Sequence, residues 1–219
     1  MNRPQPRCPP GGRPRAQRLG LHLEAGMRVG LYGGSFNPAH EGHAHVARTA
    51  RARLGLDLVV WLIAAGNPLK GRPAPFPART ASAARFAGRA MVVSDGERRM
   101  GSRYTIDTVR LLQARFPYVR FVWIMGADNL ANLHRWRDWV GLMNEIPVAV
   151  VARPGASLRA LASPAARRFA AARLPGGAGR RLAFANPPAW IYLTGPWNHA
   201  SSTALRLASS RQDLGPQTW

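Results

Sequence analysis

Short apolar, β-branched runs alternate with longer helix-compatible stretches from Met27 onward. The apolar runs are Val29 to Tyr32, Leu58 to Ile63, Met91 to Val93, Phe121 to Met125 and Val148 to Val151. The helices expected between them are Glu41 to Leu54, Ala78 to Ala90, Thr105 to Phe116 and a segment from about Ala127 to Asn144. Buried strands separated by helices predict a single-domain α/β fold: a doubly wound, Rossmann-like, mostly parallel sheet flanked by helices. Ligands bind such sheets at the carboxyl ends of the strands.

Two regions fall outside this alternation. Residues 1–26 are rich in arginine and proline and lack the apolar core of a secretory signal, so we expect a disordered basic leader, or a true start of translation at Met27. The expected domain therefore covers residues 27–211, followed by a tail at 212–219. Residues 153–181 carry seven arginines and no acid and predict a surface helix pair with loops.

The high positive charge of the chain is weak evidence for a nucleic-acid partner. The chain carries 31 Lys and Arg against 10 Asp and Glu, a net charge of +21, but Lys70 is its sole lysine. Such a skew is typical of a GC-rich genome, and small polyphosphates suit a basic field as well as nucleic acid does. No apolar run is long enough to cross a membrane, and the single Cys8 permits no internal disulfide, so we expect a cytoplasmic protein.

The first strand runs into the most informative segment, Gly33-Gly34-Ser35-Phe36-Asn37-Pro38-Ala39-His40-Glu41-Gly42-His43. A glycine turn lets the backbone approach a ligand, and the free amides of the helix that follows form an anion site. His40 and His43 share a helix face, so phosphate is the expected occupant. Zinc is the less favoured alternative, because His45 leaves that face and no cysteine or suitably spaced carboxylate joins the cluster. We therefore expect no resident metal.

A second motif stands about 160 residues later, at Ser201-Ser202-Thr203-Ala204-Leu205-Arg206. Ser202 is suited to cap the last helix, and Arg206 lies one turn on, which gives a second phosphate cradle. A capped surface helix without function is the alternative. Together the two motifs resemble those of the HxGH nucleotidyltransferase superfamily. The segments Asn67 to Lys70, Tyr104 to Thr108 and Gly126 to Trp139 resemble its bacterial nicotinate mononucleotide adenylyltransferase branch.

The resemblance implies transfer of the adenylyl group of ATP to nicotinate mononucleotide in NAD biosynthesis, with Mg²⁺ entering on ATP. The implied catalytic residues are His40, His43, Lys70 and Arg206. The implied ATP-binding residues are Gly33, Gly34, Ser35, Phe36, His40, His43, Asp128, Ser201, Ser202, Thr203 and Arg206. The implied nicotinate mononucleotide-binding residues are Tyr104, Thr105 and Trp136.

Some of these residues also have a plain structural interpretation. Thr105 is expected as an N-cap whose helix offers amides to the nicotinate carboxylate. Trp136 is expected to stack on the pyridine ring, with core packing as its alternative, whereas Trp139 is expected in the core. Asp128 is expected to bind a ribose or to cap the following helix.

Two other functions stay open. One is a different HxGH adenylyl- or cytidylyltransferase, and the other is a basic nucleic-acid-binding module that uses residues 153–181. The second is disfavoured, because binding a phosphate backbone requires neither the histidine motif nor the Trp136 segment. The sequence departs from the superfamily's usual motifs at Ser35, Asn37, Leu69 and Ala200, while the histidine, glycine, serine and arginine positions of the motifs are intact. The sequence leaves homo-oligomerisation open.

Overall fold

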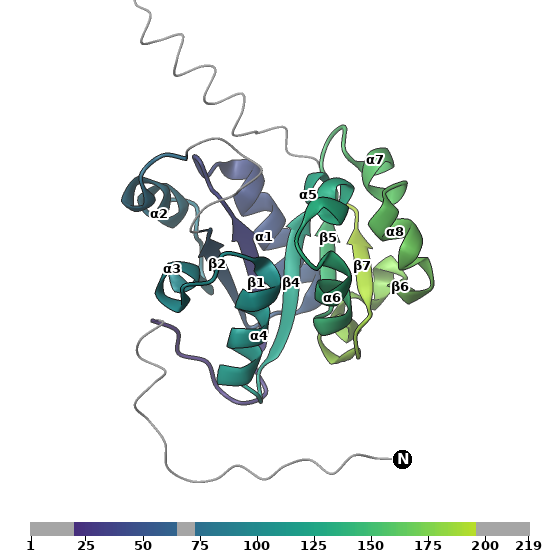
Figure 1. Ribbon diagram of the computed structural model, residues 1–219, viewed down its shortest axis with the longest axis horizontal. Helices are drawn as coiled ribbons and strands as arrows, with labels where there is room; N and C mark the ends of the chain where they lie inside the picture. Colours follow the sequence, from purple (N-terminus) through teal and green to yellow (C-terminus); the bar gives the residue numbers. More distant parts are fainter. Residues whose placement is uncertain (1–19, 65–72, 196–219) are drawn as a thin grey trace, which may run out of the picture.

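The computed structural model describes residues 20–64 and 73–195, which form one seven-stranded sheet in the order β3-β2-β1-β4-β5-β7-β6 (Figure 1). The strands are β1 (Arg28–Gly34), β2 (Leu58–Ile63), β3 (Met91–Ser94), β4 (Arg120–Gly126), β5 (Val148–Val151), β6 (Arg173–Leu174) and β7 (Trp190–Leu193). Every adjacent pair is parallel. The predicted fold class is therefore confirmed.

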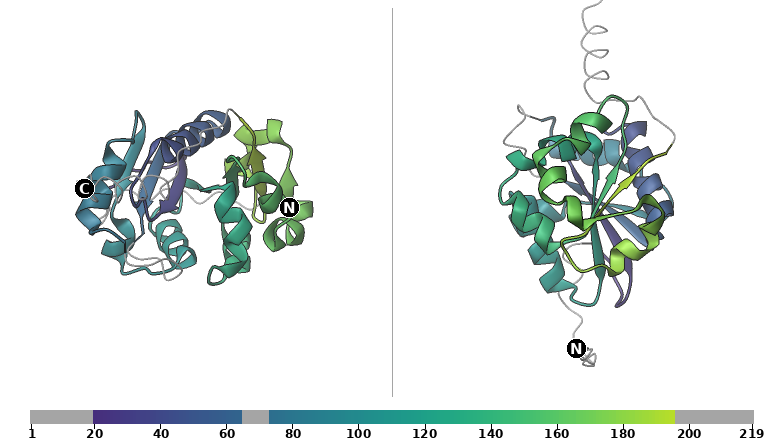
Figure 2. Two further views of the ribbon diagram at one scale, coloured as in Figure 1. Left: turned by 90° about the horizontal axis from the view of Figure 1, so that it is seen from above. Right: turned by 90° about the vertical axis from the view of Figure 1, so that its right-hand side faces the viewer.

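Helices cover both faces of the sheet (Figure 2). They are α1 (Glu41–Leu54), α2 (Phe76–Ala84), α3 (Gly96–Met100), α4 (Thr105–Arg115), α5 (Ala127–Asn132), α6 (Trp139–Glu145), α7 (Ser157–Leu161) and α8 (Pro164–Arg168). Short 3-10 helices are η2 (Leu133–Arg135), η3 (Ala170–Ala172) and η4 (Gly176–Phe184). The buried residues of α1, α2 and η4 pack on one face, and those of α4 to α8 pack on the other.

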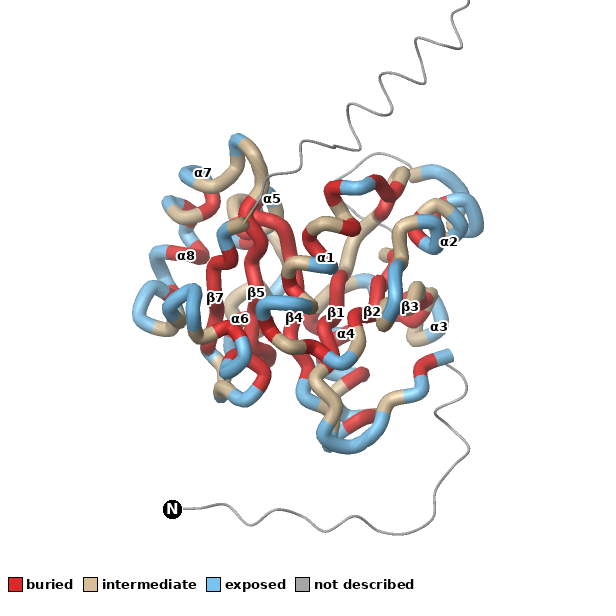
Figure 3. Tube along the Cα trace, turned by 180° about the vertical axis from the view of Figure 1, so that it is seen from behind, coloured by how far each residue is buried: buried red, intermediate tan, exposed pale blue. Residues whose placement is uncertain are grey.

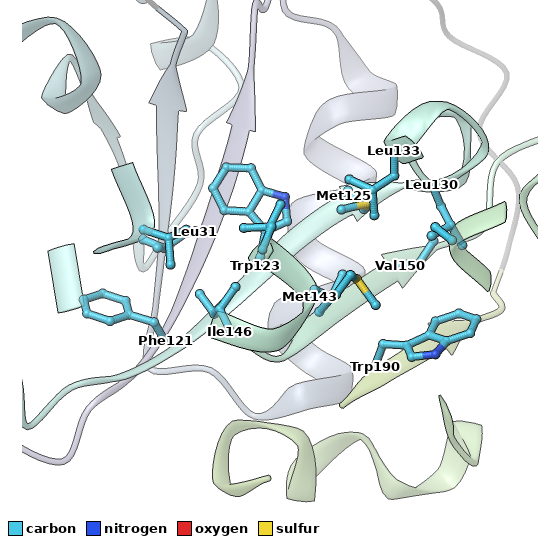
Figure 4. Close-up of a cluster of buried hydrophobic side chains, with 14 of the residues drawn as sticks. Leu31, Phe121, Trp123, Met125, Leu130, Leu133, Met143, Ile146, Val150 and Trp190 are labelled. Atoms are coloured by element: carbon cyan, nitrogen blue, oxygen red, sulfur yellow. The ribbon is translucent and has the colours of Figure 1, made fainter. Parts of the chain in front are cut away.

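Because both faces of the sheet are covered, the strands β2, β4, β5 and β7 are almost wholly buried, whereas the edge strands β3 and β6 are only partly buried (Figure 3). The larger core cluster joins the sheet to α4, α5 and α6. Figure 4 shows its part between the sheet and the segment from α5 to α6. In it, Trp123 and Trp190 are about 1% exposed, and the Trp190 indole N–H donates to the carbonyl of Phe169 at 2.7 Å. That bond satisfies a polar atom which burial would otherwise leave costly.

The sequence pattern located most elements. The α1 helix and the strands β2 and β5 have the predicted bounds, and β1, β3, β4 and α4 differ from prediction by at most two residues at either end. The α2 helix was predicted at Ala78 to Ala90, but it begins at Phe76 with Pro77 in its first turn and ends at Ala84. Proline fits there because the first turn needs no donor from it.

The predicted helical segment from Ala127 to Asn144 is wrong as one element. The chain forms α5 and η2, turns through Trp136, and starts α6 after Asp138. Asp138 takes a left-handed conformation, with φ of 47°, and its carboxylate accepts the Gly141 N–H at 3.1 Å. This aspartate N-cap restarts the helix.

Residues 153–181 hold the predicted helix pair, α7 and α8, but also strand β6. The sequence pattern also missed α3 and β7. A two-residue strand has no recognisable periodicity, and β7 is defined by its pairing, Val148 with Trp190 and Val151 with Leu193. Strand β6 depends on its tertiary partner, whereas the apolar run of β7 carries the same local signal as the predicted strands and was overlooked.

The packed chain includes residues ahead of the boundary predicted at Met27. Leu21 is 2% exposed within the larger core cluster, and the Gly26 N–H donates to the Tyr118 carbonyl at 2.8 Å. This segment is therefore part of the fold.

We predict that Leu21→Ala lowers the free energy of unfolding by about 3 kcal/mol, because it leaves a cavity in a closed core. The exposed neighbour His22 offers the control His22→Ala, expected within about 0.5 kcal/mol of the parent chain. Urea unfolding of the three chains measures both values. Equal stabilities would show that the Leu21 packing contributes nothing.

Candidate functional site

A cavity of about 360 Å³ opens at the carboxyl ends of β1, β2, β4 and β5. It lies at the switch point of the sheet, since β1 leads into α1 on one face and β4 leads into α5 on the other. Its lining comprises Tyr32, Gly33, Gly34, Ser35 and His43 near β1, Ala64 after β2, Glu97, Arg103, Tyr104 and Thr105 around α3 and α4, Trp123, Asp128, Asn129, Arg135, Trp136 and Arg137 from β4 to η2, and Arg153 after β5.

The glycine loop after β1 is packed from beneath by aromatic rings. A Cβ on Gly33 would overlap the indole ring of Trp123, and one on Gly34 would stand 3.0 Å from the ring of Phe36. Phe36 itself has a φ of 45° and is buried against Trp61 at 5.0 Å between ring centroids. Because its side chain is buried away from the cavity, Phe36 can reach a ligand only through its backbone.

The two motif histidines meet at the start of α1. His40 is the N-cap, and its Nδ1 accepts the Gly42 N–H at 3.1 Å. The His40 N–H in turn donates to His43 Nδ1 at 3.3 Å, and the two rings are 3.9 Å apart between centroids. Since each Nδ1 accepts a backbone hydrogen, each neutral ring carries its proton on Nε2. His43 lines the cavity and His40 lies behind it.

Burial lowers the pKa of His40 from 6.5 to about 4, with the positive charge of Arg153 adding to the effect and Asp128 opposing it. The lowered pKa agrees with the hydrogen bond, because an Nδ1 that accepts a backbone N–H leaves the ring neutral. His40 is thus a neutral cap that holds His43 in place.

We predict that stability falls as the pH drops from 6.5 toward 4, because the unfolded chain takes up a proton at His40 that the folded chain resists. His40→Asn keeps a side-chain acceptor for the cap and does not titrate, so its thermal unfolding midpoint should fall less over this window. Thermal melts of both chains between pH 7 and pH 4 measure the difference. Parallel curves would contradict the buried neutral state of His40.

A charged pair crosses the cavity between β4 and β5. Arg153 Nε lies 3.5 Å from Asp128 Oδ1, and Arg153 Nη2 donates to the Tyr32 hydroxyl at 3.4 Å. Burial raises the pKa of Tyr32, with Arg153 opposing, so this hydroxyl stays protonated. Asp128 is in the first turn of α5 but forms no side-chain cap there, so the capping interpretation is wrong. Gly126 leaves room for both charged groups.

The opposite end of the cavity is aromatic. Tyr104, Thr105 and Trp136 all line it, and the guanidinium of Arg137 lies over the Tyr104 ring at 4.6 Å. Tyr104 rather than Thr105 is the N-cap of α4, which corrects the prediction; Thr105 is the first helical residue. In the first turn of α4, the Asp107 N–H donates to the Tyr104 carbonyl at 3.1 Å, so the N–H groups of Thr105 and Ile106 are the donors of the anion site predicted there.

The two nearby tryptophans differ as the sequence indicated. Trp136 lines the cavity, although it also packs on the core. Trp139 is absent from the lining and meets Phe169 edge to face at 6.0 Å between ring centroids.

The structure brings together most of the predicted residues: Gly33, Gly34, Ser35, His43, Tyr104, Thr105, Asp128 and Trp136 line one cavity. Lys70, Ser201, Ser202, Thr203 and Arg206 lie outside the described residues.

Sequence reasoning missed Glu97, Arg103, Arg135, Arg137 and Arg153, which also line the cavity. Arg153 carried a usable signal, because it stands two residues after a buried strand in a fold that binds ligands there.

Neither a metal cluster nor a membrane helix occurs in the part of the chain that the structure describes. No three His, Cys, Asp or Glu side chains within residues 20–64 and 73–195 are placed to hold a metal ion. None of the helices in these ranges is long and apolar enough to cross a membrane.

Comparison with known proteins places this fold and cavity in a class. Residues 31–208 match the cytidylyltransferase-like family, which is a class of nucleotidyltransferases. A protein of Caulobacter sp. strain K31 named "probable nicotinate-nucleotide adenylyltransferase" is 63% identical over 183 residues, 82% of this chain and 97% of its own. A protein of the same name from Rhizobium meliloti is 49% identical over 84% of this chain and all of its own. The chain belongs to the nicotinate-nucleotide adenylyltransferase family.

Solved structures agree on the fold. The nicotinic acid mononucleotide adenylyltransferase of Plasmodium falciparum, complexed with NaAD, has a TM-score of 0.62 and 15% identity, covering 83% of each chain. Its complex with APC has a TM-score of 0.60. At this identity the likeness establishes the fold alone.

Proposed function

We propose that this protein transfers the adenylyl group of ATP to nicotinate mononucleotide, forming nicotinate adenine dinucleotide and pyrophosphate in NAD biosynthesis. The observation that carries the proposal is one cavity with a histidine-bearing helix start at one end and an aromatic, amide-rich helix start at the other. The names of the relatives at 63% and 49% identity support the same reaction.

The phosphate end needs only alignment and charge stabilisation. A 5′-phosphate oxygen of nicotinate mononucleotide attacks the α-phosphorus of ATP, the bond to the β-phosphate oxygen breaks, and pyrophosphate leaves. The attacking group is already an anion at neutral pH, so no side-chain nucleophile is required. His43 Nε2 is the donor for the transferring phosphoryl group, because its Nδ1 is bound to the His40 backbone.

The backbone of Gly33, Gly34 and Ser35 is proposed to complete this end of the site, and the missing Cβ atoms of the two glycines let this backbone lie directly on the Trp123 and Phe36 rings. Lys70 and Arg206 are proposed to hold the β- and γ-phosphates, and Ser201, Ser202 and Thr203 to add hydroxyl and amide donors. These five assignments rest on the sequence motifs alone.

Arg153 is proposed to face the phosphate of the nucleotide acceptor. Its Nε is buried without a hydrogen-bond partner and meets Asp128 only at ion-pair distance. A buried donor without a partner is costly, and a phosphate oxygen would satisfy it. Asp128, half exposed beside it, is then placed to accept from a ribose hydroxyl.

Mg²⁺ is proposed to arrive bound to ATP. It prefers phosphate oxygens and water, and it would neutralise the charge of the leaving pyrophosphate. Asp128 and Glu97 are the carboxylates that line the cavity, and neither is needed as a resident ligand in this arrangement.

The end of the cavity that holds Tyr104, Thr105 and Trp136 is proposed to bind the pyridine ring and to select nicotinate over nicotinamide. The first-turn amides of α4 face the nicotinate carboxylate, and the helix dipole favours a negative group there. Trp136 is placed to stack on the pyridinium ring. An uncharged nicotinamide would gain less from the same helix end.

Purified protein should release pyrophosphate from ATP and Mg²⁺ only when nicotinate mononucleotide is present. Absence of release would refute the proposal, and release with CTP in place of ATP would instead favour a cytidylyltransferase. Six of the seven arginines of residues 153–181 are exposed, so tight, salt-sensitive DNA binding without pyrophosphate release would favour the nucleic-acid alternative. Oligomeric state plays no part in this proposal.

A further inference from the structure

One face of α2 holds the glycine–histidine loop, the segment from Gly33 to His40. The Ala39 N–H donates to Ser82 Oγ at 3.0 Å, and Arg79 Nη1 donates to the Ser35 carbonyl at 2.9 Å. Arg79 and Ser82 are one turn apart and so share a helix face. Just before α2, the Ala74 N–H donates to Asn37 Oδ1 at 3.1 Å. The loop is therefore bound at successive points along its length.

Arg79 makes the widest set of these contacts. Its Nη1 also donates to the Ala64 carbonyl at 2.8 Å, and its Nε donates to the Ala74 carbonyl at 3.0 Å. One guanidinium thus joins three separate segments: the loop after β1, the end of β2 and the residue that precedes Pro75 and α2. A planar fork of fixed donors suits this task, whereas an ammonium group cannot reproduce its directions.

Burial makes this arrangement costly. Arg79 is 3% exposed, and the three acceptors above are neutral carbonyls rather than carboxylates. Burial lowers the pKa of its guanidinium, and the charge of Glu97 opposes that change. Arginine remains protonated even so. The fold therefore keeps a positive charge directly behind the loop that carries the histidines.

Two of the carbonyls that Arg79 binds belong to walls of the cavity, since Ser35 and Ala64 both line it. A single nitrogen, Nη1, joins both of them. Any displacement of the guanidinium would therefore shift the glycine loop relative to β2, and the loop amides with it.

We propose that Arg79 is a positioning residue of the nucleotide site, which fixes the glycine–histidine loop against β2 and α2 so that its amides and His43 meet the phosphates. This role rests on the proposed adenylyl transfer. If Arg79 has this role, loss of its guanidinium should affect kcat and the KM for ATP more than the KM for nicotinate mononucleotide. The end of the cavity that is proposed to bind the pyridine ring is built from other elements.

The test compares Arg79→Met and Arg79→Lys with Arg98→Met. Arg98 is a matched control, because its guanidinium also lies over the Phe76 ring, at 5.4 Å against 5.2 Å for Arg79, but its side chain is 65% exposed. We expect kcat to fall about 20-fold and the KM for ATP to rise in both Arg79 variants, since small misplacements of reacting groups cost this much. The KM for nicotinate mononucleotide should change less than threefold, and Arg98→Met should match the parent chain.

Amide hydrogen exchange over residues 33–40 gives a readout that does not require activity. Exchange there should accelerate in Arg79→Met and Arg79→Lys while β4 and α4 stay as protected as in the parent chain. Arg79→Lys with parental kinetics and exchange would overturn the proposal, as would equal increases in both KM values. If the parent chain shows no adenylyl transfer, the proposed function fails, and the exchange experiment still decides whether Arg79 holds the loop.

Discussion

His43→Ala is expected to lower kcat for adenylyl transfer by two to three orders of magnitude while the chain stays folded. His43 lines the cavity, and its Nδ1 accepts the His40 N–H, so its Nε2 proton is directed to the ligand side. Removing one preorganised donor from a transferring group costs about 100- to 1,000-fold in other enzymes. Single-turnover measurements with saturating ATP and nicotinate mononucleotide give the rate of the chemical step.

The control is His45→Ala. His45 lies two residues further along α1, and it is absent from the cavity lining. Its removal should change kcat less than threefold, and the melting temperatures of both variants should be within a few degrees of the parent chain. A rate for His43→Ala equal to that of the parent chain would remove this residue from the phosphate site.

Trp136→Ala is expected to raise the KM for nicotinate mononucleotide by about 50-fold and the KM for ATP by less than fivefold. An indole stacked on a cationic pyridinium contributes about 2 kcal/mol when the pair is desolvated, and its dispersion contacts add to that. The effect should be selective because Trp136 lies at the end of the cavity that also holds Tyr104 and Thr105. Titration of each substrate against a fixed excess of the other measures both constants.

Trp139→Ala separates stacking from packing. Trp139 packs against Phe169 and not on the cavity, so its loss should lower the melting temperature more than it changes either KM. If Trp136→Ala instead raises both KM values equally and destabilises the fold as Trp139→Ala does, then Trp136 is a packing residue.

The fold could be predicted where local pattern and tertiary environment agree. The α1 helix runs from Glu41 to the left-handed Gly55 that ends it, and β2 is a continuous apolar run between polar turns. The break at Asp138 could not be predicted in this way. The Asp138 side chain accepts the Gly141 N–H and so divides a pattern that otherwise looks like one helix. Strand β6 could not be foreseen, since its two residues are strands only through pairing with β7.

The site was predictable to the extent that its chemistry is local in the chain. The glycines and histidines stand within one loop, so spacing alone indicates a phosphate site. Arg79 has no such signal: it lies within a helix, and its importance comes from carbonyls of Ser35 and Ala64, which are distant in sequence. Arg153 was expected among surface arginines, whereas the end of β5 turns it to Tyr32 and Asp128.

The identity of the product tests the central claim most directly. The protein should be incubated with ATP, Mg²⁺ and nicotinate mononucleotide, and in parallel with nicotinamide mononucleotide, and the dinucleotides formed should be identified by mass. We expect nicotinate adenine dinucleotide in amounts equal to the pyrophosphate released, and much slower formation of the amide product. No dinucleotide from nicotinate mononucleotide, or equal rates with both mononucleotides, would contradict a site in which Trp136 and the start of α4 select the nicotinate acid.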